Sequence, residues 1–390
     1  MKILQMFPFF SLSYYGGIFT VGYSLSKALA ARGHDVVVYT TDLKFSHQLI
    51  DSTDIKVHPF PARLKLAGFL ITPAMQREMR RNLREFDIIH CHNFRGFQEI
   101  LLDYYARRYG IPYLIDAHGS TLRTGKRFLK WLFDIFFGYR ILRNAARVIA
   151  ETEVGVKEYE EMGTSRDKIV LIYPPFPVEE YSQLPPPGYF REKFKIHETH
   201  IILFLGRINW IKGLDFIVKS FRILHNQRED VILVIVGNDD GYKSTLEGLI
   251  NKLDLQDKVL FTGFLAGEKK KEALVDTSIM VQTSIYEQGL SLACVEAILC
   301  NTPIIVSKNT GAGEDILRMG GGYVIKYGNE EEMVTTINEI LDRPGEAADT
   351  TLKMKKYIET NMSMAKRIEE YEKLYIQCIE ESRYKKGNRK

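Results

Sequence analysis

Short apolar runs alternate with helical patterns along the first half of the chain. The runs are rich in β-branched residues and are bounded by Gly, Pro or Asp. Runs of this kind predict strands that are buried on both faces. Their alternation with helices predicts an α/β architecture, a parallel sheet with helices on both sides. The expected strands of the first half are residues 2–7, 35–40, 55–59, 87–91, 112–118, 147–150 and 168–173.

A second series of the same kind follows the segment QLPPPGYF, residues 183–190. Its prolines and glycine cannot continue a helix or a central strand, so the segment predicts a linker. We expect two Rossmann-like, doubly wound domains over residues 1–184 and 185–364, with a ligand in the cleft between them. A charged helix over residues 365–390 is expected to pack back on the first domain. The expected strands of the second half are residues 200–206, 230–237, 258–263, 278–283, 303–307 and 322–327.

The composition is typical of a globular protein with two domains. A chain of 390 residues, 45% hydrophobic and 26% charged, is too long for one compact core. Its 4 cysteines show no C-x-x-C spacing and no cluster with histidines, which predicts reduced thiols in a reducing compartment. The first expected strand follows Met1 directly, and no apolar run approaches the roughly 20 residues of a membrane-spanning helix. We therefore expect a cytoplasmic protein without a signal peptide.

The positive charge of the chain is unevenly distributed. Residues 61–147 contain 13 Arg and 3 Lys against 7 acidic residues, which favours an anionic partner unless these are simply solvated helix faces. Within this region, residues 124–147 mix aromatic and basic side chains, as on a helix at a lipid interface. The segment equally fits a helix packed on the first sheet. The lipid-interface interpretation places the protein at the inner face of an anionic membrane. No nucleic-acid-binding module is visible in the sequence.

Two cations follow the first expected strand of the second half. In the segment LFLGRINWIKGLDF, the strand ends at Gly206, and Arg207 and Lys212 precede an amphipathic helix. Cations at the carboxyl end of a strand, beside a helix N-terminus, predict a diphosphate site. The alternative is that both are exposed loop cations without a ligand.

The segment TSIYEQGLSLACVEAILC, residues 283–300, places acidic residues on both sides of an expected helix start near Ser291. Backbone amides at a helix start are unpaired and can point at an anion. Glu296 lies roughly 7.5 Å further along the helix axis, where a carboxylate can bind the hydroxyls of a ribose. The amides expected at the anion belong to Gly289, Leu290, Ser291 and Leu292.

The first half contributes small and titratable residues at expected strand ends. Gly16 and Gly17 follow the first strand, where glycine lets the backbone approach a phosphate or sugar, although a plain turn is also possible. His118 ends the strand PYLIDAH, a position that favours a functional role. His92, in DIIHCHN, either lines an acceptor site or is hydrogen-bonded by its neighbours.

Together these segments resemble the retaining, family-4 type of glycosyltransferases with the GT-B fold. The resemblance covers nearly the whole chain and includes YYGGIFTVGYSLSKALAARGHDVVVYT, IPYLIDAHG, GRINWIKG, VIVGNDDG and VLFTGFL. It implies transfer of a sugar from a UDP- or GDP-linked donor, without a metal or other cofactor. It also implies that Arg207 and Lys212 neutralise the leaving diphosphate and that His118 contacts the donor sugar.

The acidic motif departs from the family pattern S-x-x-E-G-F-G-L-x-x-L-E-A. The family has seven residues between its first acid, near the donor sugar, and its second acid, at the ribose. Here that spacing leads back from Glu296 to Gln288, whereas counting from Ser284 leads to Glu287. We favour Glu287 as the first acid, with Gln288 as a donor-binding neighbour, because one inserted loop residue costs little. Residues 172–181 depart as well, since Pro175-Phe176 replaces the family's Asn-Gly pair.

The expected function is that of a retaining hexosyltransferase acting on a glycan or lipid-linked acceptor. One alternative within the same fold is a sugar-nucleotide epimerase. Another is a non-catalytic subunit that binds a nucleotide sugar, which Gln288 and the altered turn favour. The presence of Arg207, Lys212, Glu296 and His118 argues against that second alternative.

Overall fold

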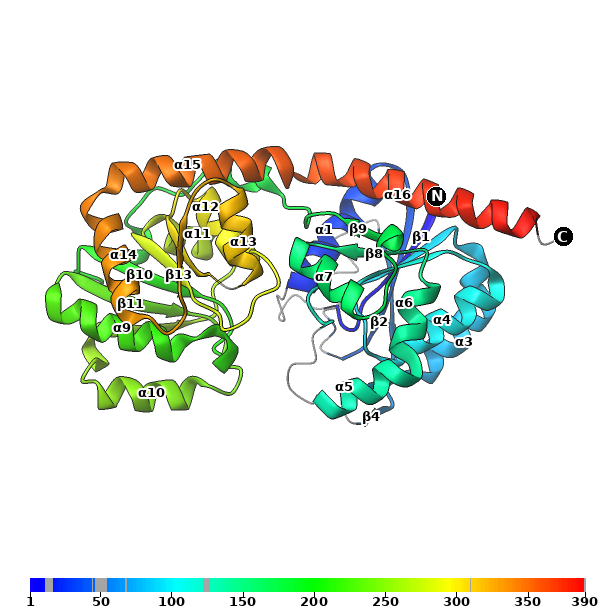
Figure 1. Ribbon diagram of the computed structural model, residues 1–390, viewed down its shortest axis with the longest axis horizontal. Coiled ribbons are helices and arrows are strands. Elements are labelled where there is room, and N and C mark those ends of the chain that lie inside the picture. Colours follow the sequence, from blue (N-terminus) through cyan, green and yellow to red (C-terminus); the bar gives the residue numbers. More distant parts are fainter. Residues whose placement is uncertain are drawn as a thin grey trace. The chain divides into compact units, whose positions relative to one another are not determined.

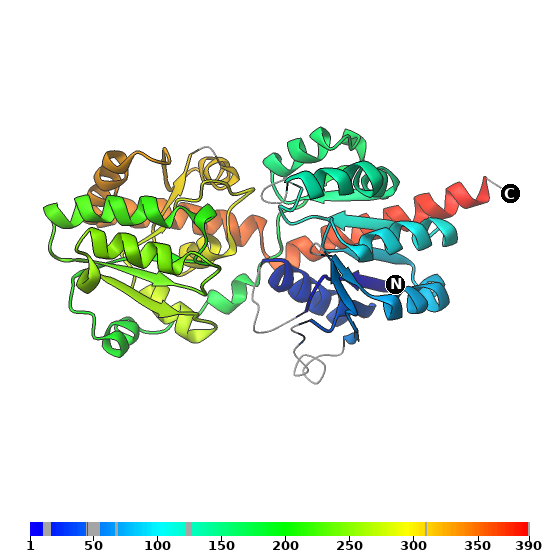
Figure 2. The same cartoon turned by 90° about the horizontal axis from the view of Figure 1, so that it is seen from below.

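The computed structural model describes residues 1–10, 17–43, 45, 55–66, 69–121, 127–308 and 310–388. The chain forms two compact units, Met1–Pro177 with Asn361–Lys390 and Val178–Thr360 (Figure 1). Each unit is a parallel sheet with helices on both faces, as Figure 2 shows from a second direction. No helix in the described part of the chain is long and apolar enough to cross a membrane.

The sheet of the first unit has seven parallel strands, with the order β3-β2-β1-β6-β7-β8-β9. All strands expected in the first half are present. A short antiparallel hairpin, β4 (Leu64–Leu66) with β5 (Phe69–Ile71), was not expected. The bounds of the parallel strands are β1 (Lys2–Met6), β2 (Asp35–Thr41), β3 (Lys56–Phe60), β6 (Ile88–Cys91), β7 (Tyr113–Asp116), β8 (Arg147–Ala150) and β9 (Ile169–Leu171).

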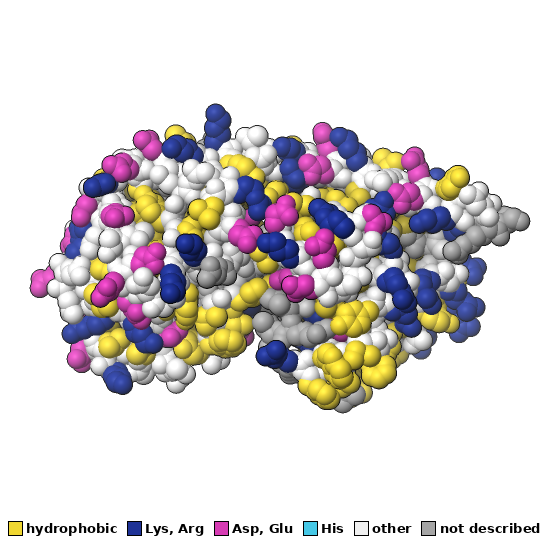
Figure 3. Space-filling model, viewed as in Figure 1, with side chains coloured by type: hydrophobic (Ala, Val, Ile, Leu, Met, Phe, Trp, Pro, Cys, Tyr) yellow, Lys and Arg dark blue, Asp and Glu magenta, His cyan; other side chains and the backbone are white. Residues whose placement is uncertain are grey.

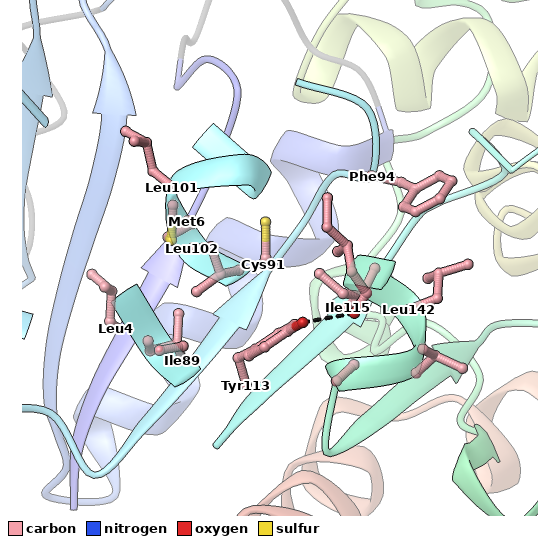
Figure 4. Packing of buried hydrophobic residues seen from close by; sticks show 14 of the residues in the cluster. Leu4, Met6, Ile89, Cys91, Phe94, Leu101, Leu102, Tyr113, Ile115 and Leu142 are labelled. Atoms are coloured by element: carbon pink, nitrogen blue, oxygen red, sulfur yellow. Dashed lines mark hydrogen bonds between the residues drawn. The ribbon is translucent and has the colours of Figure 1, made fainter. Parts of the chain in front are cut away.

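Alternate strand residues of this sheet face two separate cores. Leu4 and Met6 pack on one side, where the Tyr113 hydroxyl donates to the Ile141 carbonyl at 2.6 Å (Figure 4). The other core includes Ile3 and Tyr375. The helices of the first side are α3 (Pro73–Asn82), α4 (Phe97–Tyr109), α6 (Tyr139–Asn144) and α7 (Glu153–Glu161), and those of the other side are α1 (Gly17–Ala31) and α16 (Met364–Gly387).

One helical segment of the first unit contains a widened turn. The helix α5 (Arg127–Phe133) continues through the π-helical turn η2 (Asp134–Gly138) into α6. The Asp134 carboxylate is fully buried and pairs with Arg95 at 2.7 Å from Nε to Oδ1. Arg95 also donates to the carbonyls of Ser120 and Thr121. The ion pair therefore ties the widened turn to the loop after β7.

The second unit has a six-stranded parallel sheet with the order β12-β11-β10-β13-β14-β15. All strands expected in the second half are present. Their bounds are β10 (His200–Leu205), β11 (Val231–Val236), β12 (Val259–Gly263), β13 (Ile279–Gln282), β14 (Ile304–Ser307) and β15 (Tyr323–Ile325). The helices of one face are α9 (Leu214–Gln227), α10 (Lys243–Lys252) and α14 (Glu330–Asp342), and those of the other are α11 (Glu268–Val275), α12 (Leu292–Leu299) and α13 (Gly311–Arg318).

The first unit ends at Pro177 and the second begins at Val178, seven residues before the boundary expected at 184/185. The short helix η4 (Val178–Tyr181) packs against α12 in the second unit. The Pro-rich segment then leads into α8 (Tyr189–Phe194), where the amides of Gly188, Phe190 and Arg191 donate to the Asp276 carboxylate at 2.5–3.0 Å. These contacts fix the expected linker within the second unit.

The altered turn of residues 172–181 has a structural role in the first unit. Phe176 is buried, its amide donates to the Met362 carbonyl at 2.9 Å, and its carbonyl accepts from the Met364 amide at 3.0 Å. The segment that leaves this unit therefore pairs with the segment that returns to it before α16.

Candidate active site

Lys212 and Glu287 form an ion pair at the carboxyl ends of two neighbouring strands. Lys212 closes the 3-10 turn η5 (Trp210–Lys212) after β10, and Glu287 follows β13. The Lys212 Nζ lies 2.6 Å from Glu287 Oε2, with 15% and 19% of the two side chains exposed. The Ser284 hydroxyl donates to the same oxygen at 2.8 Å. The structure thus brings together the cation and the acid that the sequence singled out.

Two glycines let the chain approach this pair closely. Gly213 has a φ of +66°, and a Cβ there would lie 2.2 Å from the Thr283 carbonyl oxygen. A Cβ on Gly311 would lie 1.6 Å from the Gln288 carbonyl oxygen, and the Gly311 amide donates to the Glu287 carbonyl at 2.7 Å. The loop after β13 is therefore held between η5 and the start of α13, which fixes Glu287 beside Lys212.

Arg207 is more exposed than Lys212 and has a different partner. Its side chain is 58% exposed, and its Nη1 lies 2.6 Å from Asp240 Oδ2. The Asn209 amide donates to the same oxygen at 3.0 Å. Sequence reasoning missed Asp240, although it follows β11 in the quoted segment VIVGNDDG. Each of the two expected diphosphate cations thus already faces a carboxylate.

The start of α12 differs in part from the expected anion site. Ser291 caps the helix, its hydroxyl accepting from the Cys294 amide at 3.3 Å. The Leu290 amide was expected to be unpaired, but it donates to Asp315 Oδ2 at 2.8 Å, because the first turns of α13 bring that carboxylate to the loop. Gly289 and Leu292 are half-buried beside it. The helix start is therefore accessible, but one amide beside it, that of Leu290, is already hydrogen-bonded to Asp315.

Glu296 is buried in α12 between two partners from other elements. Its Oε1 lies 2.6 Å from the Lys270 Nζ of α11. Burial raises the pKa of the Tyr181 hydroxyl, and the charge of Glu296 and a hydrogen bond to it raise that pKa further. Sequence reasoning found neither partner, because both lie far from Glu296 in the sequence. The carboxylate is thus held in place by a cation and a phenol.

In the first unit, His118 occupies a strained turn at the end of β7. His118 has a φ of 43° and Gly119 a φ of 77°, both in the left-handed region. The Ser120 amide donates to the Ala117 carbonyl at 2.9 Å and closes the turn. A residue with a β-carbon is uncommon in this conformation, and such strain occurs preferentially at functional sites.

The His118 ring is enclosed by two carboxylates and a second histidine. Nδ1 lies 2.8 Å from Glu151 Oε1 and 3.5 Å from Asp116 Oδ1. Nε2 lies 3.0 Å from His92 Nδ1. Burial alone would lower the pKa of His118, but the carboxylates of Asp116 and Glu151 outweigh it and raise that pKa to about 9. Burial raises the pKa of the Asp116 carboxyl.

His92 is hydrogen-bonded by its neighbours rather than exposed at an acceptor site. Its Nε2 lies 2.6 Å from Gln5 Oε1, and its ring stacks on Phe7 at 4.5 Å between centroids. Burial, together with the neighbouring His90 and His118, holds the pKa of His92 well below its usual range. This resolves the alternative that the sequence left open.

The glycine pair after the first strand is described only in part. Gly16 lies outside the described residues, and Gly17 is the first residue of α1. The expected approach of this loop to a phosphate or sugar stays a prediction.

Side chains of the kinds that bind metals gather at two points around β7. The groups are His90, His92 and Asp116, and Asp116, His118 and Glu151, with possible ligand atoms within 4.8 Å of one another. However, both ring nitrogens of His92 and of His118 are occupied by the protein hydrogen bonds described above. We therefore treat these residues as a hydrogen-bond network and assign no metal to them.

Two family models match the chain. The model for Glycosyltransferase Family 4 matches residues 15–180, and the model for Glycosyl transferases group 1 matches residues 189–360. The uncharacterized glycosyltransferase MJ1069 of Methanocaldococcus jannaschii is 26% identical over 395 residues, covering 96% of this chain and 98% of that protein.

Two further comparisons extend this similarity. A GDP-mannose-dependent alpha-(1-6)-phosphatidylinositol monomannoside mannosyltransferase of Mycolicibacterium smegmatis is 25% identical over 164 residues, 40% of this chain and 43% of that protein. The crystal structure of Anabaena Alr3699/HepE in complex with UDP and glucose has a TM-score of 0.81 at 17% identity, covering 97% of this chain and 100% of that one. At that identity the structural likeness shows the fold.

Proposed function

Because the chain is a glycosyltransferase of the family-4 type with the GT-B fold, we propose that it transfers a sugar from a nucleoside-diphosphate donor with retention at the anomeric carbon. The observation that carries this proposal is the pairing of Lys212 with Glu287 at the strand ends of the second unit. A half-buried lysine beside the start of α12 is a suitable partner for a diphosphate. The sugar and nucleotide in the Anabaena structure support this class of ligand.

The leaving diphosphate would be stabilised by fixed positive charge. Lys212 supplies a point charge, and Arg207 a planar group that can grip two oxygens. Both cations are held by carboxylates before the donor arrives, so little reorganisation is needed during the reaction. Glu287 is bound by Lys212 and by the Ser284 hydroxyl. It therefore suits a role in orienting the sugar better than that of a nucleophile, which agrees with retention by attack from the leaving-group face.

The other site residues would position the remaining parts of the donor. Glu296, held by Lys270, would accept hydrogen bonds from the ribose hydroxyls. The loop of Gln288 and Gly289 would lie along the diphosphate. His118, at the end of β7, would act on a donor sugar, the role that the family resemblance implies for it.

Nucleotide binding followed by product analysis tests the proposal. We expect one of UDP, GDP and ADP to raise the unfolding temperature in a concentration-dependent way, and the matching sugar donor to be used only when an acceptor is added. NMR of the product should show the anomeric configuration of the donor. Donor conversion without an acceptor would favour an epimerase, and binding without turnover a non-catalytic subunit. Absence of nucleotide binding would contradict the proposal altogether.

Transfer should continue after treatment with EDTA. Lys212 and Arg207 provide the positive charge that a magnesium ion provides at other diphosphate sites. Initial rates should therefore be equal in EDTA and in added Mg²⁺ or Mn²⁺. An absolute requirement for a divalent cation would contradict the roles given to the two side chains.

The acceptor we propose is carried by a lipid, at an anionic membrane surface on the cytoplasmic side. Large apolar side chains are exposed along α5 and η2, led by Phe128 at 68% and Phe136 at 65%. Figure 3 shows hydrophobic side chains gathered where Figure 1 labels α5. Exposed aromatic residues in an arginine-rich region suit a lipid interface. The name of the mycobacterial relative states a phosphatidylinositol-linked acceptor for that protein.

Liposomes test this surface directly. The protein should sediment with vesicles that contain acidic phospholipid, and less so at high salt, because screening weakens its attraction to the surface. A variant with Phe128→Ser, Trp131→Ser and Phe136→Ser should lose most of this binding. Leu352→Ser is a suitable control, since Leu352 is a large apolar residue of the second unit with an exposed fraction of 61%, within the range of the three substituted residues. Equal sedimentation with and without acidic lipid would favour a soluble acceptor.

A further inference from the structure

A chain of buried hydrogen bonds connects His118 with the C-terminal helix α16. Beyond the contact of His118 Nε2 with His92 Nδ1, His92 Nε2 lies 2.6 Å from Gln5 Oε1. The Gln5 amide nitrogen is 3.4 Å from the Tyr375 hydroxyl, which is 2.7 Å from His90 Nδ1. The four side chains beyond His118 are all buried. The chain therefore has little access to water that could satisfy a broken link.

The direction of each hydrogen bond follows from the donors and acceptors available. Burial lowers the pKa of His90 to about 3, so its ring is neutral and Nδ1 can accept the Tyr375 hydroxyl proton. The Tyr375 oxygen is then free to accept from the Gln5 amide, which turns Gln5 Oε1 toward His92. A neutral histidine has one N–H, so the proton of His92 is on Nε2 and its Nδ1 is an acceptor.

This arrangement requires two protons on His118. Its Nε2 faces the acceptor Nδ1 of His92, and its Nδ1 faces the Glu151 carboxylate, which can only accept when ionised. Both ring nitrogens must therefore donate. If the Gln5 amide were reversed, every bond of the chain would reverse, and His118 would be neutral.

The surrounding carboxylates select between the two arrangements. Those of Glu151 and Asp116 lie 2.8 and 3.5 Å from His118 Nδ1. Their negative charge favours the arrangement with a charged His118. The described charged and titratable groups around this turn are Asp116, Glu151, His90, His92, Tyr159, Arg95, which donates to the Ser120 carbonyl, and, on α16, Arg367, Tyr371 and Tyr375.

We propose that Gln5, oriented by the Tyr375 hydroxyl, fixes the proton of His92 on Nε2 and thereby holds His118 as an imidazolium cation. Gln5 and Tyr375 are then positioning residues, since they act on His118 through other side chains. The part of this proposal that concerns sugar transfer rests on the proposed function. There, His118 would be a permanent positive charge beside the donor and not a base that removes a proton from the acceptor.

NMR of the side-chain nitrogens tests the proposal without any activity measurement. In wild-type protein labelled with ¹⁵N-histidine, His118 should be doubly protonated at neutral pH and lose a proton as the pH rises through about 9. His92 should remain neutral with its proton on Nε2. A neutral His118 at neutral pH, or a His92 proton on Nδ1, overturns the proposal. A failure of glycosyl transfer would leave this result unaffected.

Variants of Gln5 separate its role from simple packing. Gln5→Met removes the amide and should lower the His118 midpoint by about one pH unit, a tenfold change in the protonation equilibrium. Gln5→Glu keeps an acceptor toward His92 Nε2 and should keep the wild-type midpoint or raise it. Tyr371→Phe is the matched control, since its buried hydroxyl has no hydrogen-bond partner among the described residues. If Gln5→Met titrates like Tyr371→Phe, Gln5 does not set the charge; should it fail to fold, the wild-type spectrum still decides.

Discussion

Replacement of Lys212 by alanine is expected to lower the turnover number by about 10²–10³-fold, the loss typical of one preorganised group that stabilises transition-state charge. Lys212 is half-buried and fixed by Glu287, so its charge acts in a poorly screened environment. Arg207→Ala should act in the same direction, because its guanidinium lies at the end of the same strand. The measurement is the steady-state rate, with circular dichroism to show that the fold is kept.

A lysine elsewhere in the second unit provides the control for this prediction. Lys219 is exposed on α9 and pairs at 3.4 Å with Asp215, one turn away. Lys219→Ala should therefore transfer sugar like the wild type, since exposed pairs contribute little. Wild-type turnover in Lys212→Ala or Arg207→Ala would exclude that side chain from the site.

The second large effect is expected at Glu287. Glu287→Gln removes the charge that faces Lys212 and should impair use of the donor, while Gln288→Ala should be nearly silent. If Gln288 holds the first position of the acidic motif instead, the two sensitivities will be reversed and Gln288→Glu will be tolerated. The contact of Glu287 with Lys212 and Ser284 is our reason for preferring the first outcome.

The same prediction extends to Glu296, the second acid of the motif, where ligand binding is the quantity to measure. Glu296→Gln should weaken binding of the free nucleoside diphosphate and of the intact donor alike, because both contain the ribose. Calorimetric titration with both ligands distinguishes it from Glu287→Gln, which should affect the intact donor more. Glu247→Gln, exposed on α10, is the control. A Glu296→Gln protein that binds both ligands like the wild type would exclude the ribose assignment.

The two-domain GT-B fold could be predicted from the sequence because its strands are buried on both faces. Such strands are visible in the sequence as continuous apolar runs. A helix between consecutive strands returns the chain to the same edge of the sheet, so the strands are predicted to be parallel. The hairpin β4–β5 was missed because three-residue strands are too short to show a pattern. The change of unit at Pro177/Val178 lies before the prolines that suggested a linker, because η4 packs against α12 and Asp276 anchors the start of α8.

The residues that the sequence singled out lie in loops after strands or near a helix start, where residue type and position give a local signal. Lys212, Glu287 and His118 were singled out in this way, and their roles stay predictions. The family was recognised from motifs along the whole chain, and the comparisons confirm it. The partners that orient these three residues come from distant parts of the chain. Glu151 follows β8. Gln5 lies inside β1, in a mostly apolar strand sequence that carries no sign of a functional residue. Which side chains meet across a sheet depends on register and rotamers, and neither leaves a local signal.

The widened turn η2 lets this helical segment carry one extra residue while the exposed aromatic side chains keep their direction. A π-helical turn accommodates one residue more than an α-helical turn. Deleting one residue from Asp134–Gly138 would therefore convert the turn to an α-helical one and leave α5 in nearly its present orientation relative to the buried α6. A deletion within α5 has no such compensation, and it would rotate the residues before it by about 100°. A single-codon deletion between Phe128 and η2 can thus redirect Phe128 without substituting it.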